Sequence, residues 1–172
     1  MAELLTQYFD SLLITMAVLA VVVYVALHFV TAGYGMMYNK RWGLTVNNRL
    51  GWVLMEAPAF IVMFALWWAS GRRFEAAPMV MAMLFLLHYF QRSFIFPMLI
   101  RGKGRMPWSI ILMGVIFNSI NAVMQGGWIF YVSAPDRYPT SWLCSPQFII
   151  GALVFFTGMA INIHRDSVIR NL

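Results

Sequence analysis

The stretch SLLITMAVLAVVVYVALHFVT, residues Ser11–Thr31, contains no Asp, Glu, Lys or Arg. As an α-helix with a rise of 1.5 Å per residue, it is long enough to cross the roughly 30 Å of hydrocarbon in a bilayer. It has no basic leader segment and no A-x-A cleavage site, so we interpret it as a retained membrane span rather than a signal peptide. The same pattern predicts four further spans, at approximately Leu50–Ser70, Ala77–Ile100, Trp108–Ser133 and Pro146–Ile163.

The overall composition supports this interpretation. The 172 residues are 62% hydrophobic and 10% charged, whereas soluble domains average about 45–50% and about 25%. A chain of this length cannot enclose so much apolar surface in a soluble globule, and its single cysteine, Cys144, cannot form an internal disulfide. Because lipid leaves no backbone polar group solvated, each span must be helical. We therefore predict an all-α fold in which residues 1–172 form one multi-pass transmembrane helical bundle with five spans.

The basic residues predict how this bundle is oriented. Twelve Lys and Arg against six Asp and Glu give a net charge of +6, which in a soluble protein would suggest nucleic acid. Here the basic residues lie between apolar runs, so we interpret them as contacts to membrane lipid headgroups and expect no nucleic-acid partner. Eight would lie on one side of the membrane: Lys40, Arg41, Arg49, Arg101, Lys103, Arg105, Arg165 and Arg170. Only three would lie on the other: Arg72, Arg73 and Arg137. The N-terminus is therefore expected outside, and the first loop, third loop and C-terminal end in the cytoplasm.

Several polar residues lie inside the predicted spans, where lipid should exclude them. A charged Glu56 at that depth costs several kcal/mol unless it is paired, protonated or hydrated. Counted from the cytoplasmic ends, Glu56, Tyr89, Arg92 and Asn118 all fall about 9–17 Å deep at 1.5 Å per residue. We expect them to meet at one level and to form a polar-ended pocket that opens to the cytoplasm. Arg92 is expected to pair with Glu56 or with a bound anion.

Two helical faces carry further polar residues. Asn118, Asn121 and Gln125 are offset by three and seven residues, so they share one face. Hydrogen bonds that only hold helices together explain this face as well as a functional site does. A second face combines Asn162, Asp166 and Arg170, provided that the last helix continues to the end of the chain. No metal site is predicted, because the histidines lack a spaced set of partner ligands.

Six motifs occur in a fixed order. They are GYG at Gly33–Gly35, W-x-L-x-E-x-P at Trp52–Pro58, HYFQR at His88–Arg92, FPMLIRG at Phe96–Gly102, NAVMQG at Asn121–Gly126 and GMAINIHRD at Gly158–Asp166. In this order, and with this spacing, the sequence resembles the steroid 5α-reductase family (3-oxo-5α-steroid 4-dehydrogenases) from about Gly33 to the last residue. The long string GM-x-INIH-x-D is the most specific of the motifs.

The resemblance implies a membrane enzyme that reduces the 4,5 double bond of a 3-oxo-4-ene steroid with hydride from NADPH. Carried over, Glu56 and Tyr89 are the catalytic residues that bind and polarise the 3-oxo group. The predicted substrate contacts are Trp52, Met55, Arg92 and Asn118. The predicted cofactor contacts are Asn162, Asp166, Arg101, Lys103 and Arg170, with the two basic residues of the third loop meeting phosphate. The sequence has no G-x-G-x-x-G motif after a strand, so no soluble-type dinucleotide domain is expected.

The sequence departs from the family pattern in two respects. Met55 stands where familiar members carry Gln, so the expected partner is a steroid or a steroid-like lipid enone. The family also continues beyond the residue equivalent to Leu172, with an R-K-P-G-like loop, a Tyr/Gly-rich cofactor segment and about two further helices. We therefore expect seven helices in the complete protein, with the rest of the cofactor-binding region outside this chain. A bacterial inner membrane is favoured over the endoplasmic reticulum.

Two other classes of protein compete with a steroid reductase. A related membrane enzyme, such as a lipid enoyl reductase or an isoprenylcysteine-type methyltransferase, would pair a similar helical shell with a lipid-borne substrate. A non-enzymatic transporter or scaffold subunit would use the polar residues only to join helices and would tolerate Glu56→Gln. The INIH-x-D string together with Glu56 and Tyr89 favours the reductase, whereas a requirement for S-adenosylmethionine would overturn it.

Overall fold

The computed structural model describes residues 2–30, 43–101 and 104–171. Five helices in this part of the chain are long and apolar enough to cross a membrane, which confirms the predicted all-α multi-pass architecture. The long helices are α1 (Ala2–Ala26), α2 (Asn48–Ala69), α3 (Ala76–Phe90), α5 (Trp108–Gly127) and α6 (Pro146–Asn171). The shorter elements are β1 (Thr45–Asn47), π-helix η3 (Gln91–Ile95), α4 (Phe96–Leu99), β2 (Arg105–Pro107), π-helix η4 (Trp128–Val132) and the 3₁₀-helix η5 (Thr140–Cys144).

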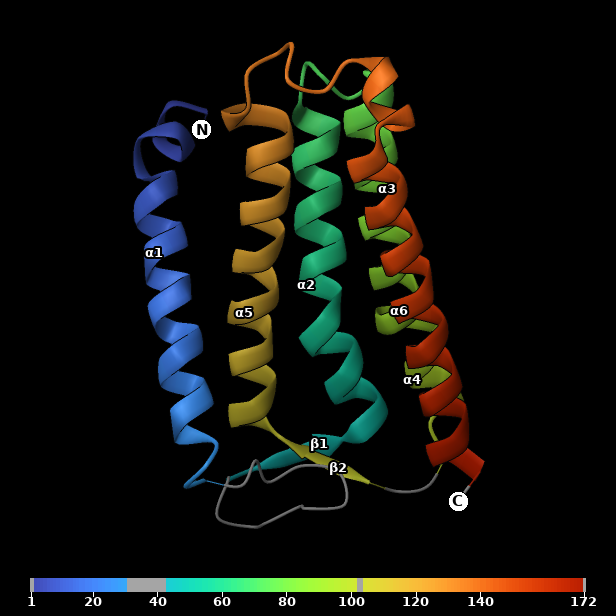
Figure 1. The fold of residues 1–172 in the computed structure, drawn as a ribbon. Helices are drawn as coiled ribbons and strands as arrows, with labels where there is room; N and C mark the ends of the chain where they lie inside the picture. Colours follow the sequence, from blue (N-terminus) through green and yellow to red (C-terminus); the bar gives the residue numbers. More distant parts are fainter. Residues whose placement is uncertain (1, 31–42, 102–103, 172) are drawn as a thin grey trace.

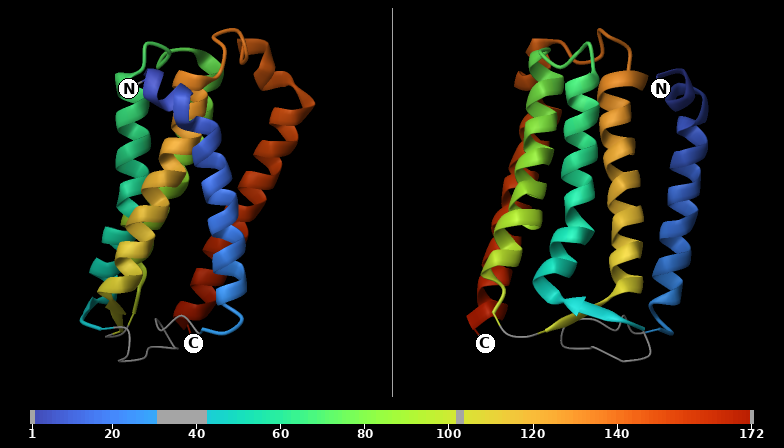
Figure 2. Two further views of the ribbon diagram at one scale, coloured as in Figure 1. Left: turned by 90° about the vertical axis from the view of Figure 1, so that its left-hand side faces the viewer. Right: turned by 180° about the vertical axis from the view of Figure 1, so that it is seen from behind.

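The long helices run in a common direction between two ends of the molecule (Figure 1). The N-terminus lies at one end, here called the upper end, and the C-terminus lies at the other, the lower end, beside β1 and β2. Views from the side and from behind show the same arrangement (Figure 2). The basic residues Arg49 and Arg105 lie in elements at the lower end, as does Arg101, whereas Arg72 lies at the upper end. Lys40, Arg41 and Lys103, which enter the same charge count, lie outside the described residues.

The predicted spans agree with the helices except at two places. The first helix begins at Ala2 and ends at Ala26, whereas its apolar run suggested Ser11–Thr31. The charged residues before the apolar run, Glu3 and Asp10, are exposed, so the helix continues through this segment without burying a charge. The last helix extends past Ile163 to Asn171, which meets the condition for the second polar face.

A small antiparallel sheet closes the lower end, a feature that the sequence analysis did not predict. Thr45 lies opposite Pro107 and Asn47 opposite Arg105, so β1 and β2 join the ends of the first and third loops. The Arg105 guanidinium donates to the Thr45 hydroxyl at 2.6 Å and to its carbonyl at 2.8 Å. Asn47 then caps α2, because its Oδ1 accepts from the backbone N–H of Arg49 at 2.9 Å. The sheet therefore fixes where α2 and α5 begin.

Glycines let α2 and α5 approach each other closely. A Cβ atom at Gly126 would lie 2.9 Å from Leu66 Cδ1 and 3.1 Å from Met63 Sδ, and one at Gly114 would collide with the Met55 side chain. Small residues at such positions are the usual means by which membrane helices pack without a hydrophobic driving force. Toward the upper end, the contact between α2 and α5 continues into a buried hydrophobic core, which consists of Met63, Ala82, Leu86, Ala122, Ile129 and Phe130.

Pro58 lies inside α2, two residues beyond Glu56. Proline has no backbone N–H and its ring crowds the carbonyl one turn earlier, so it bends the helix. Figure 1 shows the lower part of α2 turned away from the upper part. The bend determines how the segment that carries Glu56 faces α5.

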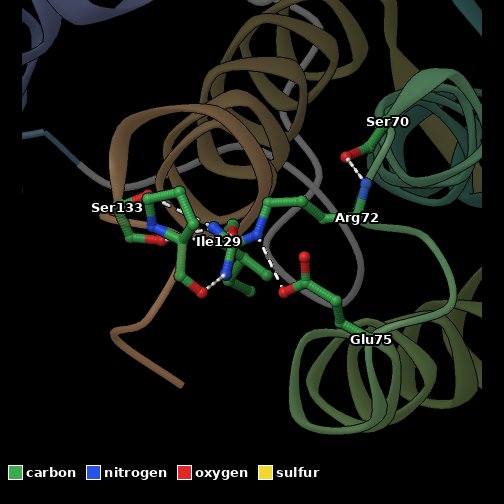
Figure 3. Close-up of polar contacts among 6 residues, drawn as sticks. Ser70, Arg72, Glu75, Ile129 and Ser133 are labelled. Atoms are coloured by element: carbon green, nitrogen blue, oxygen red, sulfur yellow. Dashed lines mark hydrogen bonds and ion pairs between the residues drawn. The ribbon is translucent and has the colours of Figure 1, made fainter. Parts of the chain in front are cut away.

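At the upper end, Arg72 joins two loops (Figure 3). Its guanidinium donates to Glu75 Oε2 at 2.9 Å, to the Ile129 carbonyl at 3.0 Å and to the Ser133 hydroxyl at 3.0 Å. Longer bonds reach the carbonyls of Ser133, at 3.2 Å, and Pro135, at 3.3 Å. The α2–α3 loop is thus tied to the end of η4 through one side chain that is 13% exposed.

Candidate active site

Polar side chains from three helices meet through hydrogen bonds in the lower half of the bundle. The Tyr89 hydroxyl donates to Asn118 Oδ1 at 3.3 Å and accepts from Asn121 Nδ2 at 3.0 Å. Asn118 Nδ2 in turn lies 3.3 Å from Glu56 Oε2, to which it donates. We call Glu56, Tyr89, Asn118 and Asn121 the polar network. The prediction that Glu56, Tyr89 and Asn118 meet at one level is confirmed.

Asn118 is the centre of the network and is only 6% exposed. Its Nδ2 also donates to the backbone carbonyl of Met55 at 2.8 Å. If the amide were turned over, its oxygen would face that carbonyl oxygen, so this bond determines which way the amide points. The backbone of α2 therefore orients the side chain that links Glu56 to Tyr89.

The elements place these residues for identifiable reasons. Asn118 and Asn121 are three residues apart on α5, so both face α3, where Tyr89 lies in the last turn. Gln125, predicted on the same face, is exposed and lies outside the network. The three polar residues of α5 therefore do not act alike: two bind Tyr89, and the third does not.

Arg92 has partners different from the one predicted. It donates to Asp166 Oδ2 at 2.9 Å and forms an ion pair there, with side chains 15% and 17% exposed, so the predicted pair with Glu56 is wrong. Its guanidinium carbon lies 4.8 Å from the centre of the Trp52 ring and 4.6 Å from that of Phe96. The π-helix η3 begins directly after Phe90, between Tyr89 and Arg92. Because a π-helical turn contains more residues than an α-helical one, the side chains of Tyr89 and Arg92 do not lie on the same helical face.

The predicted substrate contacts Trp52 and Met55 lie beside Arg92 and the polar network, respectively. Trp52 packs edge-on against Phe96, with ring centres 5.0 Å apart, and both rings meet Arg92. Met55 packs its side chain against Gly114 and gives its carbonyl to Asn118. A separate groove of about 590 Å³ lies between α2 and α3 and is lined by apolar residues, among them Phe60 and Phe90. The predicted polar-ended pocket beside Glu56 remains a prediction.

The predicted cofactor contacts lie toward the lower end. Asn162 is exposed on α6, Asp166 is half-buried one turn further along, and Arg101 is exposed just after α4. The structure brings Asp166 into contact with a predicted substrate residue, through the ion pair with Arg92. Lys103 lies outside the described residues, as does the side chain of Arg170. Among the residues that the structure does describe, no group of three His, Cys, Asp or Glu side chains is placed to bind a metal.

Comparison with known proteins adds independent information. The family model for 3-oxo-5-alpha-steroid 4-dehydrogenase matches residues 104–172. The chain is 34% identical over 167 residues to 3-oxo-5-alpha-steroid 4-dehydrogenase 1 of Bos taurus, which covers 95% of this chain and 64% of that protein. It is 30% identical over 168 residues to a steroid 5-alpha-reductase of Gossypium hirsutum, with the same coverage of both chains.

Over most of its length, the chain is similar to steroid 5α-reductases. It is also similar to 3-oxo-5-alpha-steroid 4-dehydrogenase 2 of Sus scrofa, with 31% identity over 91% of this chain and 61% of that protein. The chain spans 64% of the length of the bovine and cotton relatives.

Two parts of the site were not predicted from the sequence. Asn121 was recognised only as a member of a polar face, although its NAVMQG motif is one of those that resemble the family. The partner of Arg92 was also missed, because Asp166 is 74 residues away and no local pattern connects the two.

Proposed function

We propose that this chain forms the substrate-binding part of an integral-membrane, NADPH-dependent reductase of the 4,5 double bond of 3-oxo-4-ene steroids. The observation that carries the proposal is the convergence of Glu56 and Tyr89, from α2 and α3, on the single side chain of Asn118. The names of the matched relatives favour this reaction over a methyltransferase or a non-enzymatic scaffold.

The polar network supplies the acid half of this reaction. When hydride adds to carbon 5, electrons of the enone move onto the 3-oxygen, and a proton then adds at carbon 4. Hydrogen-bond donors held at that oxygen stabilise the developing negative charge without having to reorganise. The Tyr89 hydroxyl is such a donor, and a protonated Glu56 carboxyl is a second. Both lie in an apolar bundle, where each hydrogen bond to a developing charge is stronger than it would be in water.

The residues at the lower end suit the polar part of a dinucleotide. Arg101 offers a guanidinium for phosphate, whereas the Asn162 amide and the Asp166 carboxylate match ribose hydroxyls and a carboxamide. Lys103 and Arg170 are proposed to join them from outside the part of the chain that the structure describes. NADPH bound there would supply the hydride that adds to carbon 5. Asp166 would then contribute to both the cofactor site and the substrate site, because it also holds Arg92 beside Trp52.

We infer that the lower end faces the cytoplasm of a bacterial inner membrane and that the N-terminus lies outside. The excess of basic residues in the first and third loops and at the C-terminal end supports this orientation. A cytoplasmic lower end would place the proposed dinucleotide contacts where NADPH is available.

The test is NADPH oxidation by the full-length, detergent-solubilised protein with progesterone or testosterone, with products identified by mass. We expect a product two mass units heavier than the substrate from wild type. Glu56→Gln should lower kcat by about 100-fold, the typical loss of a general acid, and Tyr89→Phe by a similar factor. The matched control is Glu3→Gln, because Glu3 is exposed at the start of α1 and should leave kcat unchanged. A folded wild type that binds NADPH but forms no reduced steroid would refute the proposal, as would full activity of Glu56→Gln.

A further inference from the structure

The two asparagines of the polar network have no role in the reaction as described so far. We propose that Asn118 and Asn121 are positioning residues: Asn121 anchors the Tyr89 oxygen, and Asn118 orients the Glu56 carboxyl and holds the Tyr89 proton until the substrate oxygen accepts that proton. This inference rests on the proposed function, and it replaces the predicted role of Asn118 as a direct substrate contact.

A count of donors argues against direct contact between Asn118 and a ketone. A carboxamide has two N–H donors and one oxygen acceptor. Asn118 Nδ2 already donates to the Met55 carbonyl and to Glu56, and its oxygen accepts from Tyr89. A ketone oxygen only accepts hydrogen bonds, so Asn118 has no unused donor to offer it. At 6% exposure, Asn118 also presents little surface to any ligand.

The hydrogen bonds of the polar network fall into a shorter pair and a longer pair. Asn118 donates to Met55 at 2.8 Å, and Asn121 donates to Tyr89 at 3.0 Å, both ordinary lengths for N–H···O bonds. The two bonds that join Asn118 to the catalytic groups are each 3.3 Å long. The bond from Tyr89 is longer than a typical O–H···O bond of about 2.7–2.8 Å, and the bond to Glu56 is longer than a typical N–H···O bond of about 2.9–3.0 Å. The asparagines are therefore held firmly, and the catalytic groups are held weakly by Asn118.

This division suits a site that must exchange partners. The Tyr89 hydroxyl has one proton, and that proton points to Asn118 over the long 3.3 Å bond. Turning the proton toward a ketone breaks only that weak bond, while the 3.0 Å bond from Asn121 keeps the oxygen in place. A group that donates a hydrogen bond to the hydroxyl oxygen also makes the hydroxyl proton more acidic through hydrogen-bond cooperativity. Asn121 thus fixes the position of the donor and strengthens it.

The decisive experiment is a double-mutant cycle in kcat with wild type, Asn121→Ala, Tyr89→Phe and the double variant, in the full-length protein at saturating NADPH and testosterone. Because misplacing a reacting group by about 1 Å can cost about 100-fold, we expect Asn121→Ala to lower kcat by about 10-fold or more without changing the KM for NADPH. In the Tyr89→Phe background, the same substitution should change kcat by less than about 2-fold, because the anchored oxygen is already gone. Gln125→Ala, which removes an exposed amide one turn further along α5, is the control and should match wild type.

Each outcome of the cycle decides a different point. An equal loss from Asn121→Ala in both backgrounds means that the residue acts on the fold rather than through Tyr89, and it overturns the positioning role. Unchanged kcat in the wild-type background overturns it as well. A wild type that binds NADPH and testosterone without reducing the steroid refutes the proposed function, and the positioning role falls with it.

Asn118 needs a variant that keeps the fold. Leucine has the same number and branching of side-chain heavy atoms as asparagine and is apolar, so Asn118→Leu removes all three hydrogen bonds without leaving a cavity. We expect kcat per folded protein to fall at least as far as in Asn121→Ala, with the thermal midpoint of unfolding within a few degrees of wild type. A lowered midpoint with unchanged kcat per folded protein would mean that Asn118 only joins helices.

Discussion

Replacing Arg72 with methionine tests whether the upper end of the bundle depends on one guanidinium. Methionine keeps an unbranched apolar stem of similar reach but removes all five hydrogen-bond donors. In Figure 3, the Arg72 side chain crosses from the α2–α3 loop to the end of η4. Arg72→Met therefore disconnects the two loops while largely preserving the packing of the stem.

The expected loss follows from the burial of the groups that Arg72 serves. Ile129 is 8% exposed and Ser133 is 7% exposed, so their oxygens, at 3.0 Å from Arg72, are poorly reached by water. A buried acceptor left without a donor costs about 1–3 kcal/mol. The Glu75 side chain is 41% exposed and regains water, so its ion pair adds little. The Ile129 carbonyl still accepts from the Ser133 hydroxyl at 3.2 Å, so the groups left without a donor are the oxygens of Ser133. We therefore expect a loss of about 1–3 kcal/mol in the free energy of unfolding.

The assay is thermal unfolding in detergent, followed by loss of the monodisperse protein on size exclusion. For a chain of this size, about 1 kcal/mol shifts Tm by about 2–4 °C, so Arg72→Met should lower Tm by about 2–12 °C. The adjacent Arg73→Met is the matched control, because the Arg73 guanidinium makes only long contacts, 3.5 Å to the Trp68 carbonyl and 3.4 Å to that of Ser70. A fall for Arg72→Met no larger than for Arg73→Met would refute the reasoning.

Two further substitutions test other parts of the structure. Asp166→Asn keeps the shape of the side chain but removes its charge from Arg92, so it should weaken NADPH binding by about 10-fold in a tryptophan-fluorescence titration; unchanged affinity would remove Asp166 from the proposed cofactor site. Gly126→Ala should lower the free energy of unfolding by about 1–3 kcal/mol, because its Cβ would lie 2.9 Å from Leu66 Cδ1. Gly151→Ala, whose Cβ would meet nothing within 4 Å, should be neutral or slightly stabilising, so similar effects from the two alanines would contradict the close packing of α2 and α5.

Much of the site was predictable because depth in a membrane is a property of sequence position. The distance of Glu56, Tyr89 and Asn118 from the ends of their apolar runs placed all three at one level, and the structure joins them by hydrogen bonds. Asn121 was predicted to share a helical face with Asn118 and Gln125 but not to bind Tyr89. Which of the three amides on this face reach Tyr89 depends on the rotation of α5 about its axis, which spacing alone does not specify.

Other features had no signal in the local pattern. The π-helix η3 contains the same kinds of residue as an α-helix, so its five residues do not indicate that Arg92 and Tyr89 lie on different helical faces. The pairing of Thr45 with Pro107 joins three-residue strands that are too short to show the alternation of a strand. Arg72 was interpreted only as a loop charge, since its carbonyl partners, 57 and 61 residues away, can be any residue type.

The sequence by itself determined that this protein is a bundle of membrane-spanning helices and that a carboxyl, a phenol and an amide lie at one depth. Hydrophobicity and the rise of a helix are local properties, so they can be read along the chain. Only the tertiary structure decided that Arg92 pairs with Asp166 and that Asn118 links Glu56 to Tyr89. Those partners depend on how closely the helices approach at Gly114 and Gly126 and on the bend at Pro58, which are set by packing across the whole bundle.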